Sequence, residues 1–146
     1  EVEVDTETGH VRVARLVNIA DMGTPINPKI VESQLSGAAI MQLGCTLSEG
    51  MEFDAGQVTN ASLADYKIPG MRDVPDVMVN EVVEARQHSG PYGAKGVGET
   101  GTFGVSPAIT NAIHDAVGVR LTRLPVTAEA VYRAIRARNN DPLEDK

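Results

Sequence analysis

The sequence feature that most constrains this chain is a glycine-rich stretch of ten residues, numbered 93–102, which reads Gly-Ala-Lys-Gly-Val-Gly-Glu-Thr-Gly-Thr. Four glycines this close together allow backbone dihedrals that a Cβ atom forbids, and they let the backbone touch a ligand closely. Successive N–H groups in such a loop can form an anion-binding nest. Because the stretch also carries the carboxylate of Glu99, a simple phosphate cradle is disfavoured. The pattern points instead to a base beside a bound cofactor.

Two known glycine-rich motifs are excluded, and one plainer alternative stays open. Lys95 is followed by Gly96 rather than by Ser or Thr, so the stretch is not a Walker loop. No parallel-strand unit with a ribose-binding acid is expected after it, so it is not a Rossmann fingerprint. On composition alone, a flexible surface loop fits these residues as well as a binding loop does.

The length and charge of the chain limit its class. Its 146 residues allow one domain, and the formal net charge of −7 argues against a nucleic-acid partner. The single cysteine, Cys45, excludes an internal disulfide, and we expect it to be a small core residue. No apolar run approaches the ~20 residues of a membrane span. We therefore expect no membrane span and a cytoplasmic location, with the periplasm as the alternative.

The hydrophobic pattern predicts an α+β fold, in which antiparallel strands pack with a long helix and two C-terminal helices. The expected strands cover residues 2–4, 11–19, 51–58 (a short hairpin) and 77–84, and the expected helices cover 28–48, 106–117 and 128–138. We expect residues 1–138 to form one unit and residues 139–146 to be a polar tail. The chain opens without an initiator methionine, directly in strand-like sequence, so we expect a piece of a longer polypeptide or a subunit trimmed at its start.

The long helix is predicted to begin at Asn27-Pro28, an N-cap followed by a proline at the first helical position. Gly37 and Gly44 lie seven residues apart, so they share one face of this helix. Because glycine in a helix interior costs ~1 kcal/mol relative to alanine, two glycines on one stripe indicate close approach of another backbone or a ligand. Gln34 lies on or next to this stripe. The plainer alternative is a tightly packed buried helix, with Gln34 satisfied by a neighbouring loop.

The segment Gly93-Ala94-Lys95-Gly96-Val97-Gly98-Glu99 closely resembles the loop that carries the catalytic glutamate in the molybdenum hydroxylases, the xanthine dehydrogenase and aldehyde oxidase family. The large subunit of that family binds molybdopterin. Further segments resemble the family in the same order: Asp21-Met22-Gly23, Ile26-Asn27-Pro28, Gln34 with Gly37, Gln42-Leu43-Gly44, Asp65-Tyr66-Lys67-Ile68-Pro69, and Pro107-Ala108-Ile109 with Asn111-Ala112-Ile113. Several spaced motifs in register, from about Glu1 to Arg136, are far more specific than any one of them. The chain thus resembles the C-terminal part of the molybdopterin-binding subunit.

The resemblance implies a role for each matching residue. Glu99 matches the general base, which takes a proton from a water-derived oxygen as that oxygen is inserted at an electron-poor carbon, a role that favours a buried carboxylate. Gln34 matches a glutamine that contacts the cofactor. The backbone that lines the metal centre matches Lys95, Gly96, Val97 and Gly98. Because the sulfurs of the cofactor hold the metal, the resemblance implies no metal ligand from this chain.

The resemblance also implies cofactors and partners. The cofactor is molybdenum–molybdopterin, in its dinucleotide form, with iron–sulfur clusters and a candidate FAD on partner domains or subunits. The partners are the remainder of the molybdopterin-binding subunit, an iron–sulfur subunit or domain, a candidate flavin subunit and a small-molecule substrate, either an aldehyde or a nitrogen heterocycle. Many members have two prolines after the glutamate, where this chain has Thr100-Gly101, a departure that bears on the substrate. The alternative function is a non-catalytic remnant, or an assembly or binding module, that retains the fold.

Overall fold

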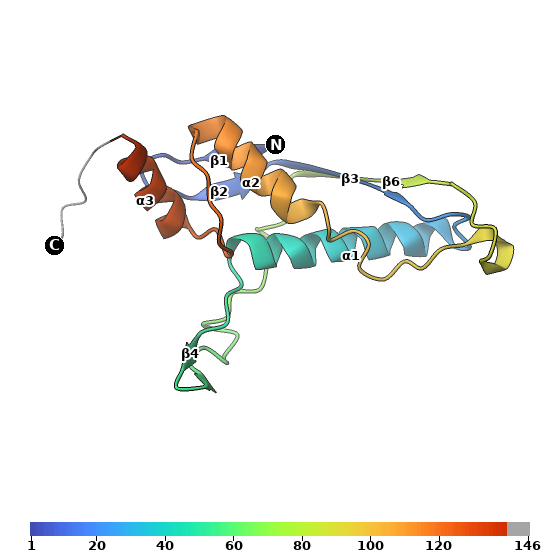
Figure 1. Ribbon diagram of the computed structural model, residues 1–146, viewed down its shortest axis with the longest axis horizontal. Coiled ribbons are helices and arrows are strands. Elements are labelled where there is room, and N and C mark those ends of the chain that lie inside the picture. Colours follow the sequence, from blue (N-terminus) through green and yellow to red (C-terminus); the bar gives the residue numbers. More distant parts are fainter. Residues whose placement is uncertain (140–146) are drawn as a thin grey trace.

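The computed structural model describes residues 1–139, and residues 140–146 of the predicted polar tail lie outside the described part. The strands are β1 (Val2–Val4), β2 (Val11–Val13), β3 (Arg15–Asp21), β4 (Phe53–Asp54), β5 (Gln57–Val58) and β6 (Val77–Val83). The helices are α1 (Pro28–Leu47), α2 (Val105–Val117) and α3 (Ala128–Arg138), with a short 3₁₀ turn, η1 (Pro91–Gly93). Figure 1 shows α1 lying along β3 and β6, while α2 and α3 gather near the N-terminal strands. The predicted α+β class with one long and two C-terminal helices is confirmed.

Both predicted hairpins are present and antiparallel. β1 pairs with β2, with Val2 opposite Val13, and β4 pairs with β5 in the arm that projects from the body in Figure 1. The turn of the first hairpin closes through the N–H of Gly9, which donates to the carbonyl of Asp5 over 2.7 Å. Gly9 has a φ of 74°, a left-handed conformation that glycine adopts without strain.

The two longest strands pair differently from the prediction. β3 and β6 run parallel, from Arg15 opposite Val77 to Asp21 opposite Val83. The prediction of antiparallel strands is therefore wrong for this pair. Alternating apolar residues indicate which face of a strand is buried but not the direction of its neighbour; here the connection through α1 returns the chain to the starting end of β3, as parallel pairing requires. The predicted strand 11–19 is also divided at Ala14, into β2 and β3.

The long helix α1 begins as predicted. The side chain of Asn27 accepts a hydrogen bond from the N–H of Ile30 over 3.2 Å, and Pro28 occupies the first turn. Farther along, the helix is joined to α2 by partly buried polar groups. Gln42 donates to the hydroxyl of Ser106 over 2.6 Å, and that hydroxyl lies 2.7 Å from the Thr46 hydroxyl. No helix among residues 1–139 combines the length and apolar character needed to cross a membrane.

The hydrophobic core has two parts. The larger cluster joins α1, α2 and α3 to the N-terminal strands, and it consists of Val13, Leu16, Ala39, Leu43, Val105, Ile109, Ile113, Val119, Val126, Val131 and Ile135. The smaller cluster, made by Met22, Val31 and Leu35, lies between the end of β3 and the first half of α1. Val97 of the glycine-rich stretch packs against this smaller cluster. The glycine-rich stretch is therefore seated on buried side chains.

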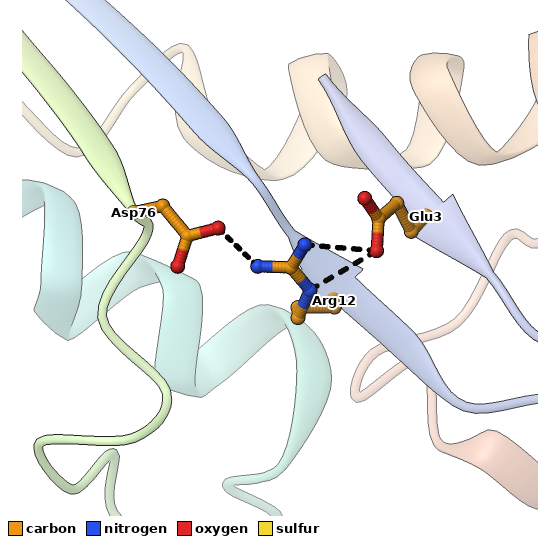
Figure 2. A network of polar contacts seen from close by, with 3 residues as sticks. All are labelled: Glu3, Arg12 and Asp76. Carbon is orange, nitrogen blue, oxygen red and sulfur yellow. Dashed lines mark hydrogen bonds and ion pairs between the residues drawn. The ribbon is translucent and has the colours of Figure 1, made fainter.

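A polar network ties the first hairpin to the start of β6. The guanidinium of Arg12 donates twice to Glu3, over 3.1 and 2.9 Å, and its remaining nitrogen pairs with Asp76, as Figure 2 shows. Because the Arg12 side chain is 44% exposed, solvent screens these charges, and we expect the network to add little to the free energy of unfolding. The network orients the hairpin; it lies at the opposite end of β6 from the residues that follow Val83.

The two helix glycines of α1 have different surroundings. Gly44 is buried, and a Cβ atom there would lie 2.6 Å from Cδ of Pro69. A close approach is therefore present at Gly44, but side chains, those of Pro69 and Glu49, make it rather than the predicted backbone or ligand. Gly37 is exposed, and a Cβ atom there would meet nothing within 4 Å. Cys45, expected in the core, is only half-buried, and this burial raises the pKa of its thiol.

The contrast between these glycines gives a matched pair of variants. Gly44→Ala should lower the free energy of unfolding by about 1–2 kcal/mol, because overpacking against Pro69 outweighs the better helix propensity of alanine. Gly37→Ala, in the same helix but in open space, should raise it by up to ~1 kcal/mol. Denaturant unfolding followed by circular dichroism measures both values. Equal shifts for the two variants would contradict the packing assigned to Gly44.

Candidate functional site

The glycine-rich stretch is the connection between η1 and α2. It follows α1 along the first half of that helix, as the yellow-to-orange trace in Figure 1 shows. The stretch is attached to the fold at its beginning, middle and end. Such repeated attachment does not fit the alternative of a flexible surface loop.

The beginning of the stretch is held by Asp21 at the end of β3. The ammonium of Lys95 lies 2.5 Å from one carboxylate oxygen of Asp21. The other oxygen accepts hydrogen bonds from the N–H groups of Gly23 and Ala85, over 3.0 and 3.3 Å. The Lys95 ammonium, and next the Gly23 N–H, hold the pKa of the Asp21 carboxyl below its usual range. The backbone N–H of Lys95 also donates to the carbonyl of Met22, over 3.1 Å.

The middle of the stretch is held by Gln34 of α1. The side-chain amide of Gln34 donates to the carbonyl of Gly98 over 2.7 Å. The structure thus brings together two residues, 64 positions apart, that the sequence assigned to one site. The neighbouring loop satisfies the amide of Gln34, as the plainer alternative proposed. The helix surface around Gln34 is exposed, however, not tightly packed.

The end of the stretch is held from two sides. Asn18 of β3 donates from its side chain to the carbonyl of Gly101 over 3.2 Å, and a Cβ atom on the buried Gly101 would lie only 2.9 Å from that amide. Thr102 donates both its N–H and its hydroxyl to the carbonyl of Glu99, over 2.9 and 2.7 Å. The peptide groups on both sides of the Glu99 side chain are therefore fixed.

The Glu99 side chain itself is exposed. Among residues 1–139, no group donates a hydrogen bond to its carboxylate or forms an ion pair with it. The burial that a catalytic role favours is therefore not supplied by the described part of the chain. A ligand or another protein segment must provide it.

Gly96 and Gly98 do not adopt the left-handed backbone conformation for which glycine is usually needed. Neither has a φ in the left-handed region, whereas Gly93 does, at 80°. A Cβ atom on Gly96 or Gly98 would meet no atom within 4 Å. Nothing within residues 1–139 therefore requires glycine at these two positions, and the space beside them is open.

The backbone donors of the same segment are unpaired. Within residues 1–139, no carbonyl or side chain accepts a hydrogen bond from the N–H groups of residues 96–101. The N–H groups of residues 93–95, in contrast, all donate to protein carbonyls. The part of the predicted nest that can bind an anion or a polar ligand edge is therefore residues 96–101.

We call the exposed surface beside these donors the open glycine face. It consists of Gln34, Gly37, Gly96, Gly98 and Glu99, all of which are exposed or half-exposed. Gly37 belongs to it because it lies one turn beyond Gln34 on the same side of α1. This face combines backbone donors, one carboxylate and room for close approach.

A hollow adjoins the Lys95 side of the stretch. Its volume is about 280 Å³, and it lies between the start of α1 and residues 94–97. Its lining is mainly apolar and consists of Met22, Thr24, Pro25, Ile26, Asn27, Ile30, Val31, Ala94, Lys95 and Val97. Within residues 1–139, no three His, Cys, Asp or Glu side chains come together in a group that could hold a metal ion. The chemistry that this part of the chain offers is therefore backbone hydrogen bonding and one carboxylate.

Two residues that hold the stretch, Asn18 and Asp21, were not predicted as site residues. Asn18 is a polar residue on the inward side of β3, which is otherwise apolar there, and that irregularity in the alternation is a usable sequence signal. Asp21 interacts with a lysine 74 positions away. Nothing in the local sequence indicates that pair.

Comparison with known proteins identifies the family of the chain. The family described as molybdopterin cofactor-binding domain matches residues 1–75. The probable hypoxanthine oxidase XdhD of Escherichia coli (strain K12) is 36% identical over 136 residues, which cover 92% of this chain and 14% of that protein. The aldehyde oxidoreductase molybdenum-binding subunit PaoC of the same strain is 39% identical over 131 residues, covering 88% and 18%.

The fold agrees with a solved structure as well. Quinoline 2-oxidoreductase from Pseudomonas putida 86 superposes with a TM-score of 0.85 at 34% identity, over 92% of this chain and 18% of that one. The chain thus spans less than a fifth of the length of the relatives it matches. On these grounds the chain belongs to the molybdopterin cofactor-binding domain family of the xanthine dehydrogenase and aldehyde oxidoreductase molybdenum-binding subunits.

Proposed function

We propose that this chain forms one wall of the molybdopterin site of a molybdenum hydroxylase, with Glu99 as the general base. The observation that carries the proposal is the run of unpaired N–H groups at residues 96–101, beside Gly96 and Gly98, whose Cβ positions are open. A cofactor with polar edges fits such a surface, because it supplies the acceptors that the protein lacks. The names of the relatives support a substrate that is an aldehyde or a nitrogen heterocycle. They do not favour the alternative of a non-catalytic remnant.

The proposed roles follow from the contacts. When bound, molybdenum–molybdopterin supplies the redox chemistry and takes up two electrons from the substrate. Gln34 holds the carbonyl of Gly98, and Thr102 holds the carbonyl of Glu99, so the carboxylate has a fixed attachment. Glu99 accepts the proton of a water-derived oxygen as that oxygen is inserted at an electron-poor carbon. Partner domains or subunits would hold the iron–sulfur clusters, and in some arrangements a flavin, that supply the onward electron transfer.

The complete enzyme tests the role of Glu99 directly. Glu99→Gln keeps the shape of the side chain and removes the base, so reduction of the metal centre by substrate should slow by ~10² to 10⁴. Molybdenum content should stay near wild type, because backbone groups form the cofactor contacts. The measurement is single-turnover reduction with metal analysis. Glu129→Gln on α3, where the carboxylate pairs with Arg133 over 2.7 Å, is the control and should reduce normally. Near-normal reduction in Glu99→Gln would remove Glu99 from the mechanism.

Gln34 gives a separate test of cofactor binding. Gln34→Ala removes the donor to the Gly98 carbonyl, and molybdenum retention in the complete enzyme should weaken about tenfold or more. Gln34→Glu should retain less still, because its carboxylate faces that carbonyl oxygen and an anionic cofactor. Gln57→Ala, on the exposed strand β5, is the matched control. Wild-type molybdenum content in both Gln34 variants would show that Gln34 only packs the loop.

The outer face of the β3–β6 pair supports the proposed partner, the remainder of the molybdopterin-binding subunit. This face carries four apolar side chains that are about half exposed, Val17 (49%), Ile19 (56%), Val77 (47%) and Val83 (48%), and one carboxylate, Glu81, opposite Ile19. Parallel sheets occur almost only with both faces covered, and here α1 covers one face alone (Figure 1). The matched segment is less than a fifth of the length of the relatives. We propose that their additional residues have counterparts that cover this face.

A substitution to lysine on the outer face tests whether other protein residues cover it. Val17→Lys should lower the melting temperature of the complete subunit, because it buries a charge beside apolar side chains such as Val79, its neighbour on β6. In the isolated chain the same change should have little effect, since Val17 is 49% exposed there. Thr6→Lys, in the exposed turn between β1 and β2, is the control in both backgrounds. Equal melting temperatures for wild type and Val17→Lys in the complete subunit would contradict the cover.

A further inference from the structure

Asp21 contacts three separate segments of the chain at once. It ends β3, and its carboxylate binds the turn at Gly23, the backbone at Ala85 just after β6, and the side chain of Lys95. The ends of parallel strands lie at one edge of a sheet. Because Asp21 at the end of β3 lies beside Val83 at the end of β6, its carboxylate can accept a hydrogen bond from Ala85. Its position therefore couples the end of the sheet to the start of the glycine-rich stretch.

Lys95 is the point at which the stretch changes from anchored to open. Before it, the carbonyl of Gly93 accepts hydrogen bonds from the N–H groups of Thr24 and Gln87, over 2.9 and 3.1 Å. After it, the N–H groups of residues 96–101 have no partner within residues 1–139. Only two residues, Gly96 and Val97, separate Lys95 from the residue whose carbonyl Gln34 holds. The direction in which the chain leaves Lys95 therefore decides where the open donors point.

The charge of Lys95 is already paired with a carboxylate within the fold. Its side chain is 30% exposed and that of Asp21 is 38% exposed, so the pair is partly shielded from water. The ammonium faces Asp21, which leaves anion binding to the backbone donors of residues 96–101. This geometry gives Lys95 an attachment role, in contrast to the lysine of a phosphate-binding loop.

We propose that Asp21, through its ion pair with Lys95, is a positioning residue that sets the path of residues 96–99 and so the place of the Glu99 carboxylate; this role rests on the proposed function of Glu99. Asp21 touches neither the open glycine face nor Glu99, and its effect passes through the backbone of the stretch. The ion pair fixes the first end of that backbone, and Gln34 fixes it again at Gly98.

The test uses the complete enzyme and a small set of variants. Asp21→Asn removes the charge that faces Lys95, and Lys95→Met removes the ammonium but leaves the hydrogen bonds of Asp21 to Gly23 and Ala85. Asp76→Asn is the matched control, since it removes a carboxylate from the Arg12 network of Figure 2 at the other end of β6. Lys95→Arg restores a cation and serves as the conservative rescue.

Two readouts separate positioning from a general structural effect. Hydrogen exchange of the amides of Thr24, Gln87 and Lys95, whose hydrogen bonds hold the start of the stretch, should accelerate about five- to tenfold in Asp21→Asn and in Lys95→Met. The rate constant for single-turnover reduction should fall about tenfold or more, because a small misplacement of a catalytic group is costly. The substrate dissociation constant should stay within about twofold. Asp76→Asn should leave all three values unchanged, and Lys95→Arg should recover most of the reduction rate.

Three results would overturn the proposal. The first is unchanged exchange at the amides of positions 24, 87 and 95 in both Asp21→Asn and Lys95→Met. The second is an equal acceleration in Asp76→Asn, which would indicate loosening of the whole fold. The third is faster exchange with a normal reduction rate, which would make the pair structural only. If Glu99→Gln alone reduces normally, the base assignment fails, while the exchange data still report whether Asp21 holds the stretch.

Discussion

The parallel pairing of β3 with β6 is the constraint on which the rest of the structure depends. Because the two strands run in the same direction, Asp21 and Val83 end side by side. The chain leaves β3 into α1 and leaves β6 into the glycine-rich stretch, so both segments start at this one edge. The two segments then run side by side, and the side-chain amide of Gln34 donates a hydrogen bond to the carbonyl of Gly98. An antiparallel pair would place the start of the stretch at the opposite end of the sheet.

The stretch combines fixed carbonyls with free donors. Side chains of the fold hold the carbonyls of Gly98, Glu99 and Gly101, through Gln34, Thr102 and Asn18 respectively. Holding a peptide group by its oxygen orients its N–H in the other direction, because the group is planar. The held carbonyls of Gly98 and Glu99 therefore orient the N–H groups of Glu99 and Thr100, which have no acceptor within residues 1–139, while the N–H beyond Gly101 is that of Thr102 and is paired. Such preorganisation lowers the entropy that a ligand must remove on binding.

Much of this fold could be predicted from the sequence, because its signals are local. The N-cap at Asn27, both hairpins and the three helices follow from capping, turn chemistry and periodicity over a few residues. The motifs of the glycine-rich stretch and Gln34 identified the family and two residues that do meet. The direction of β6 and the pair of Asp21 with Lys95 could not be predicted, because both depend on contacts between segments far apart in the chain. The exposure of Glu99 could not be predicted either, since glutamate occurs in both buried and exposed settings.

Residues that local structure alone does not explain lie on two sides of the molecule, and the two sides suit different partners. On the α1 side, Gly37, Gly96 and Gly98 give up side-chain contacts without a left-handed φ to explain them, and the amides of residues 96–101 lack acceptors within residues 1–139. Natural sequences depart from local consistency mainly at functional sites, and here the departure calls for a small polar ligand that approaches the backbone closely. On the far side of the sheet, exposed valine and isoleucine side chains offer area but no hydrogen bonds. That surface suits a covering layer of protein, because parallel sheets occur almost only with both faces covered.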